Sequence, residues 1–401
     1  MAEKSVFLHV GTPKTGTSGF QHALFTQPEK LAELGVSYPA EDFDTQFRAA
    51  LDLMDLPWGG LEQEARHAWG RLADAANAAT GRVIISHEIL GRASRLQVER
   101  ALGSLDGEIH VVVTARDLAR QLPAEWQENV KHRRTITYTD FLDAVRDPQR
   151  TREIAQWFWS VQELPDILAR WGGSLPPEQV HVVTVPPAGS AATLLGDRLA
   201  AAFGIDPVLL RPTGERANAS LGVAESALIR ALNERLDVVL PNHHYRQFVR
   251  ELLVHQNLGA SRKSPRLTLP PDVHDWASEL SHAWVAELRE QGYDVVGDLG
   301  DLIPIEQTEP FVDPDDADPG QVAEAGVRAL AASIQENARL RDVEIELHEI
   351  IDDLMRQLDE AHLTPAYKAR ERLVGLADTN PVARAGLAGY RRLRGRNSRP
   401  T

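Results

Sequence analysis

The chain has 401 residues, of which 43% are hydrophobic and 25% charged, and its 58 acidic and 43 basic side chains leave a formal net charge of −15. This composition fits one large globular domain or two modest ones. The absence of cysteine excludes disulfides, thiolate zinc sites, iron–sulfur clusters and a cysteine nucleophile, and the negative charge argues against a general nucleic-acid binder. No apolar run approaches the ~20 residues of a transmembrane helix and no signal-peptide pattern is present, so we expect a soluble, cytoplasmic protein.

The first part of the chain alternates apolar, β-rich runs with helical patterns, which predicts an α/β domain over residues 1–304. The near-continuous apolar runs are typical of strands buried on both faces of a parallel sheet. We therefore predict a three-layer α/β fold with a central parallel sheet flanked by helices. Strands are expected at 5–10, 81–87, 108–114 and 180–185, with a last element at 292–299. Helices are expected at 61–79, 118–132, 152–171, 191–203, 222–236, 245–256 and 273–291.

The composition changes after this domain. Residues 306–324 carry seven acidic side chains, no basic one and three prolines, which predicts an extended acidic linker over 305–320. The last segment, 364–401, holds nine basic and two acidic side chains and is expected to be a solvated basic tail.

Between these two segments, residues 321–363 have a strong helical pattern. Its apolar positions repeat at spacings of three and four, as in a heptad seam. Such a seam predicts either self-association through residues 321–363 or packing back onto the domain. The seam residues are Leu340, Val343, Leu347, Ile350 and Leu354.

The most informative stretch lies between the first strand and a helical pattern that runs towards Phe25. Two glycines five residues apart let the backbone wrap tightly and point its N–H groups, with the helix N-terminus behind them, at an anion. The stretch therefore predicts a phosphate- or sulfate-binding loop. It differs from a Walker A loop, in which the lysine follows the second glycine, because Thr17 stands there and the lysine is Lys14. The candidate contacts in the loop are Gly11, Thr12, Lys14, Thr15, Gly16, Thr17 and Ser18.

This arrangement resembles the 5′-phosphosulfate-binding loop of sulfotransferases that use 3′-phosphoadenosine 5′-phosphosulfate (PAPS). The resemblance covers residues 5–304 and implies a P-loop-like fold. It implies that Lys14 contacts the oxygen bridging sulfate and phosphate, and that Gly16, Thr17 and Ser18 hold the 5′-phosphate. It also implies transfer of a sulfuryl group to a hydroxyl-bearing acceptor without a metal, with adenosine 3′,5′-bisphosphate as the product. A carbohydrate, a lipid-linked sugar or a small metabolite would suit this Arg- and Ala-rich chain, which resembles bacterial cytosolic proteins.

The second strand ends in His87 and Glu88, at the same edge of the predicted sheet as the loop. Either side chain can take the proton from an acceptor hydroxyl, and the resembling families have a histidine or a glutamate in this region. Successive strand side chains point to opposite faces, so one of the two is expected to reach the acceptor, with Glu88 slightly favoured. Gly91 stands where the second histidine of an H-E-x-x-H zinc motif would be.

The third strand is followed by Arg116. In sulfotransferases an arginine here and a serine about eight residues later hold the 3′-phosphate of the cofactor, but the serine position is Ala124 in this chain. Guanidinium–phosphate pairing makes the arginine the stronger contact. The alternative for Arg116 is a structural ion pair with Asp117 or Glu125. Candidates to replace the missing hydroxyl are Gln121, Gln127 and Lys131.

A polar run before the helix at 222–236 offers a second set of cofactor contacts. Its Asn218-Ala-Ser220-Leu sequence is similar to an N-x-S-L run through which family members contact the cofactor, and Arg216 precedes it. Ser220 can instead be the N-cap of the following helix.

Two other functions stay open. A P-loop nucleotide kinase or NTPase would need a lysine at position 17 and a strand-ending aspartate for magnesium, whereas the third strand ends Thr-Ala-Arg116. A catalytically inactive α/β module that assembles through the C-terminal helix is the second, and Ala124 in place of serine is its best support.

Overall fold

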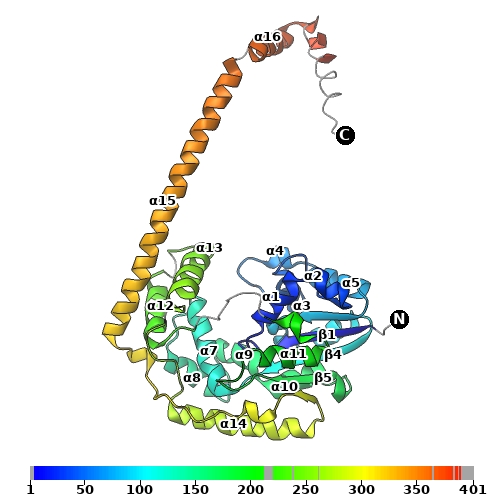
Figure 1. Cartoon of the computed structure of the whole chain (residues 1–401), viewed down its shortest axis with the longest axis vertical. Coiled ribbons are helices and arrows are strands. Elements are labelled where there is room, and N and C mark those ends of the chain that lie inside the picture. The colour runs from blue at the N-terminus through cyan, green and yellow to red at the C-terminus, as the bar shows by residue number, and fades with distance from the viewer. Residues whose placement is uncertain are drawn as a thin grey trace. The chain divides into compact units, whose positions relative to one another are not determined.

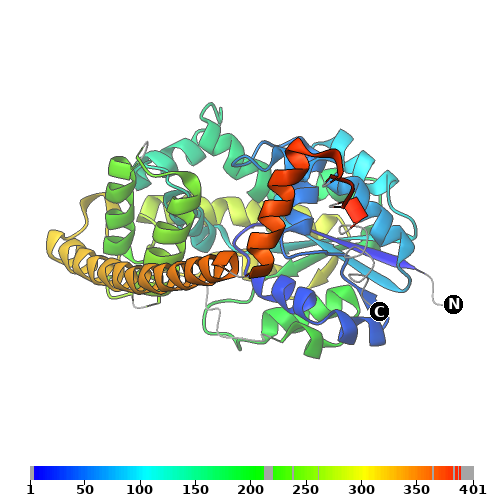
Figure 2. The ribbon, with the colours of Figure 1, turned by 90° about the horizontal axis from the view of Figure 1, so that it is seen from above.

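The computed structural model describes residues 4–211, 220–236, 239–260, 262–363, 365–382, 384–386 and 388–389. The chain divides into two compact units, the first Met1–Leu330 and the second Ala331–Thr401. Figure 1 shows the elements of both units in chain order of colour, and Figure 2 shows the same ribbon from above. Among the helices of the described residues, none is both long and apolar enough to pass through a bilayer.

The first unit is built on one sheet of six strands in the order β2-β3-β1-β4-β5-β6, and each neighbouring pair is parallel. The predicted parallel sheet is therefore confirmed. The central strands coincide with the four predicted runs: β1 (Ser5–Gly11), β3 (Arg82–Ser86), β4 (Glu108–Ala115) and β5 (Val180–Thr184). The edges are β2 (Val36–Ser37) and β6 (Asp294–Val296), and β6 lies within the predicted last element at 292–299.

Both faces of the sheet are covered by helices, which gives the predicted three layers (Figure 2). Successive side chains of β1 pack on opposite faces of the sheet. Val6, Leu8 and Val10 belong to the hydrophobic core on one face, and Phe7 belongs to the core on the other. The first core is closed by α3 (Thr45–Met54), α5 (Ala68–Ala78), α6 (Arg95–Gly103), α10 (Leu164–Gly172) and α14 (Pro271–Glu290). The second is closed by α1 (Ser18–Thr26), α2 (Pro28–Glu33), α11 (Leu194–Phe203) and the 3₁₀ turn η3 (Pro207–Leu210).

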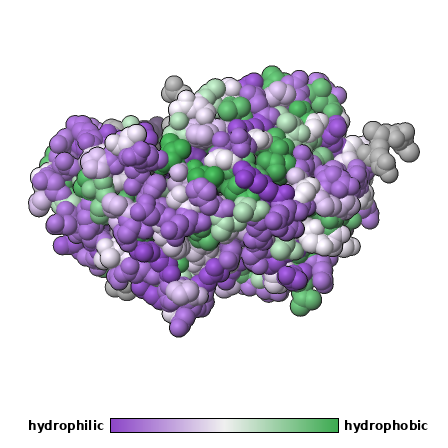
Figure 3. Space-filling model, turned by 90° about the horizontal axis from the view of Figure 1, so that it is seen from below, coloured by the Kyte–Doolittle hydropathy of each residue, from purple (hydrophilic) through white to green (hydrophobic). Residues whose placement is uncertain are grey.

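A helical part stands beside the sheet and contains α7, α8, α12 and α13 (Figure 1). The bounds are α7 (Leu118–Lys131), α8 (Tyr138–Arg146), α9 (Glu153–Gln162), α12 (Val223–Leu236) and α13 (Asn242–His244). The π-helix η4 (Tyr245–Leu258) follows α13, where an α-helix was predicted at 245–256. The other short elements are α4 (Glu62–Ala65), η1 (Glu88–Arg92), η2 (Pro177–Gln179), η5 (Leu299–Leu302) and η6 (Pro314–Asp316). The face shown in Figure 3 is mainly hydrophilic, with apolar side chains in small groups.

Two predicted helices are each broken into two. The helix expected at 61–79 is α4 and α5, because His67 between them has a left-handed backbone with φ of 59°. The helix expected at 152–171 is α9 and α10. Pro165 lies in the first turn of α10, where its missing N–H is tolerated, whereas inside one continuous helix it would break a hydrogen bond.

The stretch expected to be an extended linker is attached to the first unit. Asp315 accepts hydrogen bonds of 2.9 Å from the backbone N–H groups of Tyr138 and Thr139 at the start of α8. Further along, Arg328 contacts the buried Glu225 carboxylate at 2.6 Å. Arg328 lies in the first turns of α15 (Pro319–Leu363), so the beginning of this helix belongs to the first unit.

The named elements of the second unit are the rest of α15 and α16 (Pro365–Thr379). Ion pairs between residues three apart run along α15, for example Arg339 with Glu336 at 2.7 Å and Arg356 with Asp353 at 2.6 Å. Such pairs lie on the helix surface, where residues three and four apart are neighbours.

Candidate functional site

A cleft of about 2700 Å³ opens where β1, β3 and β4 end, and residues of α7, α9 and the π-helix form its other walls. Its volume exceeds the roughly 300–1,000 Å³ of a typical small-molecule site. Pro13, Lys14, Gly16, Thr17 and Ser18 line it after β1, as do His87 and Glu88 after β3 and Arg116 after β4. The structure thus brings the predicted loop, the candidate bases and the predicted arginine to one cleft.

The loop after β1 is fastened to β4 by hydrogen bonds. The Thr12 N–H donates to the Thr114 carbonyl at 2.7 Å, and the Thr15 hydroxyl donates to the Thr12 carbonyl at 2.6 Å. The Thr15 hydroxyl also lies 2.7 Å from that of Thr114. Thr12 and Thr15, predicted to contact the cofactor, are buried and lie off the cleft lining, so their side chains shape the loop.

A side chain at Gly11 would be crowded and its backbone strained. A Cβ atom there would stand 3.1 Å from the Glu88 carbonyl oxygen, and the backbone has φ of 146°. Glycine is the residue that adopts such a conformation readily. Gly11 therefore lets the loop pass directly beside η1, which carries the candidate base.

The N-terminus of α1 faces the cleft. The helix begins at Ser18, and its N-cap residue Thr17 makes no side-chain capping hydrogen bond. The first N–H groups of a helix have no partner within the helix and carry a partial positive charge. This end of α1, together with Gly16 and the two hydroxyls, has the donors that a phosphate group requires.

Lys14 is ion-paired with Glu128 of α7, with 2.7 Å between Nζ and Oε2. The other oxygen of Glu128 lies 3.0 Å from His132 Nε2 and 3.8 Å from Arg250. Burial alone would raise the pKa of Glu128, but the His132 hydrogen bond and the charges of Lys14 and Lys131 hold it well below its usual range. Glu128 is therefore a carboxylate at neutral pH. Sequence reasoning missed it, because only the packing of α7 against the loop brings it to Lys14.

His87 and Glu88 do not follow the alternation of a strand. β3 ends at Ser86, His87 is the N-cap of η1, and both side chains line the cleft. The alternation of a strand therefore does not separate the two residues, and which of them reaches the acceptor stays a prediction. His87 Nδ1 accepts the Ile89 N–H at 3.3 Å, and its ring stacks on Phe47 with centroids 5.0 Å apart. Burial lowers the pKa of His87, so the ring is neutral at neutral pH.

Glu88 is held as a carboxylate. Its Oε2 accepts a hydrogen bond of 3.4 Å from Gln21 Nε2 on α1. Burial raises the pKa of Glu88, but His87, a backbone hydrogen bond, Lys14 and His9 outweigh it, and the pKa lies below its usual value. An ionised carboxylate can accept a proton at neutral pH.

A buried histidine connects the two strands on either side of β1. His9 Nδ1 lies 2.8 Å from the Ser86 hydroxyl, and its Nε2 lies 3.1 Å from the Thr114 hydroxyl. Gln21 Nε2 also donates to the Ser86 hydroxyl, at 3.0 Å. Burial lowers the pKa of His9 to about 4. The only sequence signal for this network is a histidine inside an otherwise apolar strand.

Arg116 is half-buried at the end of β4 and is oriented by neutral partners. Its Nε donates to Gln121 Oε1 at 2.8 Å, and its Nη2 donates to the Arg120 carbonyl at 2.9 Å. Gln121 in turn donates to the Pro13 carbonyl in the loop. Asp117, the expected ion-pair partner, is paired with Arg120 instead. Burial lowers the pKa of Arg116 to about 10, which leaves it charged at neutral pH.

The residues near the missing serine have separate roles. Ala124 lines the cleft. Gln127 donates to the Leu221 carbonyl at 2.9 Å and accepts from the Leu221 N–H at 3.0 Å, so it fastens the segment before α12. Glu125 accepts from Gln162 at 2.9 Å, and burial raises its pKa.

Ser220 lies on the cleft lining, with its hydroxyl 3.5 Å from Gln127 Oε1. It is not the cap of α12: the Ala224 N–H donates to the hydroxyl of Ser264 at 3.0 Å. Arg216 and Asn218, the other residues predicted in this run, lie outside the described residues.

A row of aromatic side chains leads away from His87 along the cleft. The Phe47 and Trp58 rings are 5.9 Å apart, and those of Trp58 and Trp157 are 5.7 Å apart. The guanidinium of Arg92, at the end of η1, lies 4.7 Å from the Trp157 centroid. These half-buried rings give this wall of the cleft apolar faces beside charged groups.

Comparison with known proteins finds similarity at the level of solved structures. No protein-family model matches the sequence, and no curated protein matches it. The chain is similar to a sulfotransferase from Alicyclobacillus acidocaldarius whose crystal structure is known. The two chains are 13% identical, and the match covers 72% of this chain and 95% of the other, with a TM-score of 0.43.

Proposed function

We propose that this chain transfers a sulfuryl group from PAPS to a hydroxyl-bearing acceptor. The observation that carries the proposal is the convergence of Lys14, the N-terminus of α1 and Glu88 on one cleft, at the edge of the sheet where ligands bind in open α/β folds. An anion-binding loop with a cation stands there beside an ionised carboxylate. These are the groups that sulfuryl transfer to an alcohol requires.

The donor would be held mainly by the loop and by Arg116. The N–H groups of Gly16, Thr17 and Ser18 suit the 5′-phosphate, with the dipole of α1 behind them. Arg116, oriented by Gln121 and linked through it to the loop, suits the 3′-phosphate. In the second predicted run, Ser220 lies on the cleft lining and is the candidate hydroxyl for a further contact with the donor. Gln127 is engaged with Leu221, which makes it a weaker replacement for the missing serine.

In the reaction, the acceptor oxygen forms a new bond to sulfur while the bond from sulfur to the bridging oxygen breaks. The acceptor proton goes to Glu88, and the electron pair of the broken bond stays on the 5′-phosphate of adenosine 3′,5′-bisphosphate. Lys14 and the loop amides would stabilise the charge that develops on the bridging oxygen. His87 is the weaker candidate base, because its Nδ1 already accepts the Ile89 N–H.

The acceptor would enter along the aromatic row of Phe47, Trp58 and Trp157, which begins beside His87. The cleft is large enough for the donor and a second sizeable molecule. A carbohydrate, a lipid-linked sugar or a small metabolite remains the proposed acceptor class, because aromatic faces beside charged groups bind molecules of mixed polarity.

A ligand-binding experiment separates this function from its rivals. Thermal-shift titration with adenosine 3′,5′-bisphosphate should raise the melting temperature, because a ligand that binds only the folded chain stabilises it. ATP with magnesium should give a smaller shift. The reverse order would favour a nucleotide kinase, and no shift with either ligand would favour an inactive module.

Activity is tested by incubating the protein with isotopically labelled PAPS and a native extract, followed by mass spectrometry for the added sulfuryl group. The Lys14→Ala variant is the inactive control. Lys30→Ala, on the exposed side of α2, is the matched lysine control and should behave as the unaltered protein. Binding of the bisphosphate without any labelled product would overturn the catalytic proposal.

A further inference from the structure

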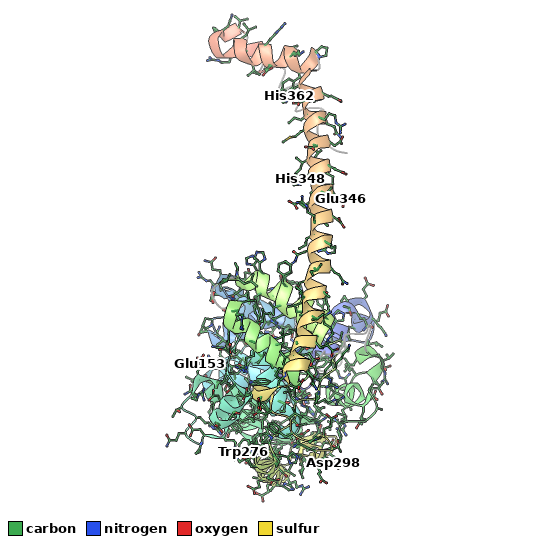
Figure 4. The ribbon with its side chains drawn as sticks, turned by 90° about the vertical axis from the view of Figure 1, so that its left-hand side faces the viewer. Glu153, Trp276, Asp298, Glu346, His348 and His362 are labelled. Carbon is green, nitrogen blue, oxygen red and sulfur yellow. The ribbon has the colours of Figure 1, made fainter. Side chains whose placement is uncertain are left out.

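The second unit carries a row of exposed apolar side chains on α15. Val343, Leu347, Ile350 and Leu354 are 38%, 53%, 48% and 57% exposed, and the half-buried Leu340 precedes them at the same spacing. Side chains stand out from the helix around Glu346 and His348 (Figure 4). Exposed rows of this length mark interaction surfaces, because leaving them in water is unfavourable.

We propose that α15 assembles with further copies of this chain into a parallel, in-register, four-stranded coiled coil over residues 340–361. The spacing assigns leucine to three a positions, at Leu340, Leu347 and Leu354, and β-branched residues to the first two d positions, at Val343 and Ile350. The third d position of this span is the polar Gln357, and its last a position is Ala361. When two identical helices lie parallel and in register, the a residues of one lie beside the a residues of the other, and the same holds for the d residues. A further copy of this chain therefore fits the seam. This inference does not depend on the proposed sulfuryl transfer.

The choice of residues at a and d sets the number of strands. Leucine at a with isoleucine at d favours bundles of more than two strands, whereas dimers favour the opposite arrangement. The e positions extend the apolar surface, because Ile351 and Leu358 are 47% and 55% exposed. A two-stranded coil would leave much of this flank in water. A four-stranded bundle has a wider core that takes it in.

Charge complementarity sets the parallel direction. In a parallel bundle Arg339, at a g position, faces the partner's Glu344, at an e position. The next two g residues face the apolar e residues at 351 and 358. In an antiparallel pair with Leu347 against the partner's Ile350, Glu346 would flank the seam beside the partner's Asp353. Like charges side by side are destabilising. The parallel arrangement has an opposite-charge pair and no such conflict.

The mass of the full chain in solution is the first test. The chain has a mass of 44.3 kDa, and light scattering behind size exclusion should give four times that value at micromolar concentration. Ile350→Lys should lower the mass to that of one chain. Asp352→Lys, on the outer f position, is the matched control and should keep four chains. A single-chain mass for the unaltered protein overturns the proposal, and a two-chain or three-chain mass overturns the number of strands.

Cross-linking tests the direction, and the chain suits this test because it has no cysteine of its own. Val343→Cys places a thiol at a d position, where copies in parallel register bring it beside its equivalent. In the antiparallel register Val343 would lie beside the partner's Leu354, about 16 Å along the helix from its own equivalent. Mild oxidation should therefore cross-link Val343→Cys and leave Ile345→Cys, on the outer face, uncross-linked. Failure of Val343→Cys to cross-link would overturn the parallel arrangement.

Both experiments are read against a folding control. Binding of adenosine 3′,5′-bisphosphate, or the melting transition of the first unit where no bisphosphate binds, should be the same in every variant. A changed transition would identify a folding defect, and the cross-linking of Val343→Cys, which keeps an apolar residue in the seam, then decides the proposal.

Discussion

Lys14 Nζ lies 2.7 Å from Glu128 Oε2, so the cation of the anion-binding loop is held by a carboxylate of α7. A polyanionic donor would compete with Glu128 for Lys14. The donor would also be repelled by negative charge on the α7 side of the cleft, where both Glu125 and Glu128 lie on the lining. Its affinity must then depend on a few focused cations and backbone N–H groups, since the chain as a whole carries a net charge of −15.

Replacing Lys14 by alanine should reduce turnover about a hundred-fold to a thousand-fold, the range found when a charge-stabilising donor is removed from an active site. Affinity for adenosine 3′,5′-bisphosphate should change only a few-fold. The bisphosphate lacks the bridging oxygen on which charge develops during transfer, so its binding depends less on Lys14. Initial rates at saturating PAPS and calorimetric titration with the bisphosphate measure the two effects. Unchanged turnover would contradict the role of Lys14.

Replacing Glu128 by glutamine should tighten binding of adenosine 3′,5′-bisphosphate several-fold, because it removes a negative charge and releases Lys14. Calorimetric titration at low ionic strength measures this, since screening by salt weakens the effect. Glu153→Gln is the control: this glutamate, labelled in Figure 4, also lines the cleft and is highly exposed. Weaker binding in Glu128→Gln would show that Glu128 supports the loop rather than competing for its lysine.

Glu88→Gln should abolish transfer while leaving bisphosphate binding intact, because the amide keeps the hydrogen-bonding shape and cannot take a proton. The pKa of Glu88 lies below its ordinary value of 4.5, so the unaltered rate should stay level as the pH falls from 7.5 to about 5.5. A rate that falls in this interval would contradict the role of Glu88 as the base. Glu64→Gln, an exposed glutamate of the same cleft, is the matched control.

Stability should fall with acidification because of His9. Its folded-state pKa is about 4, below its ordinary value of 6.5, so the folded chain resists protonation and the unfolded chain does not. The contribution of neutral, buried His9 to the free energy of unfolding is fully present above pH 6.5. It is lost as the pH falls from 6.5 towards 4, and the loss over that interval is about 3 kcal/mol. Urea unfolding at pH 7.5, 6 and 5 measures it. The slope should be smaller in His9→Gln; an equal slope would assign the acid sensitivity to other groups.

The layers of the first unit could be predicted because their signals are local. The apolar runs of β1 and β4 fill both faces of a sheet, and Gly11 with Gly16 marks the loop between strand and helix. Strand alternation does not apply at His87, because β3 ends one residue before it and the chain turns into η1. β2 has only two residues, too few for a period to be visible.

The partners of the loop could not be predicted, because they come from distant parts of the chain. Glu128 and Gln121 reach the loop only through the packing of α7. Ser264, which caps α12, lies 40 residues after the N–H group that it accepts. These contacts depend on how helices pack against each other, which residue periodicity does not encode.

The attachment of Asp315 to α8, and of Arg328 to Glu225, determines where the chain can be shortened. A version that stops at residue 304 would lose the acceptor for the first N–H groups of α8 and would leave a buried carboxylate without its cation. Such a loss is destabilising, because removing one partner of a buried ion pair leaves the other as an unpaired charge inside the protein. A shortened version that keeps both contacts therefore has to extend to about Leu330, where the first unit ends within α15.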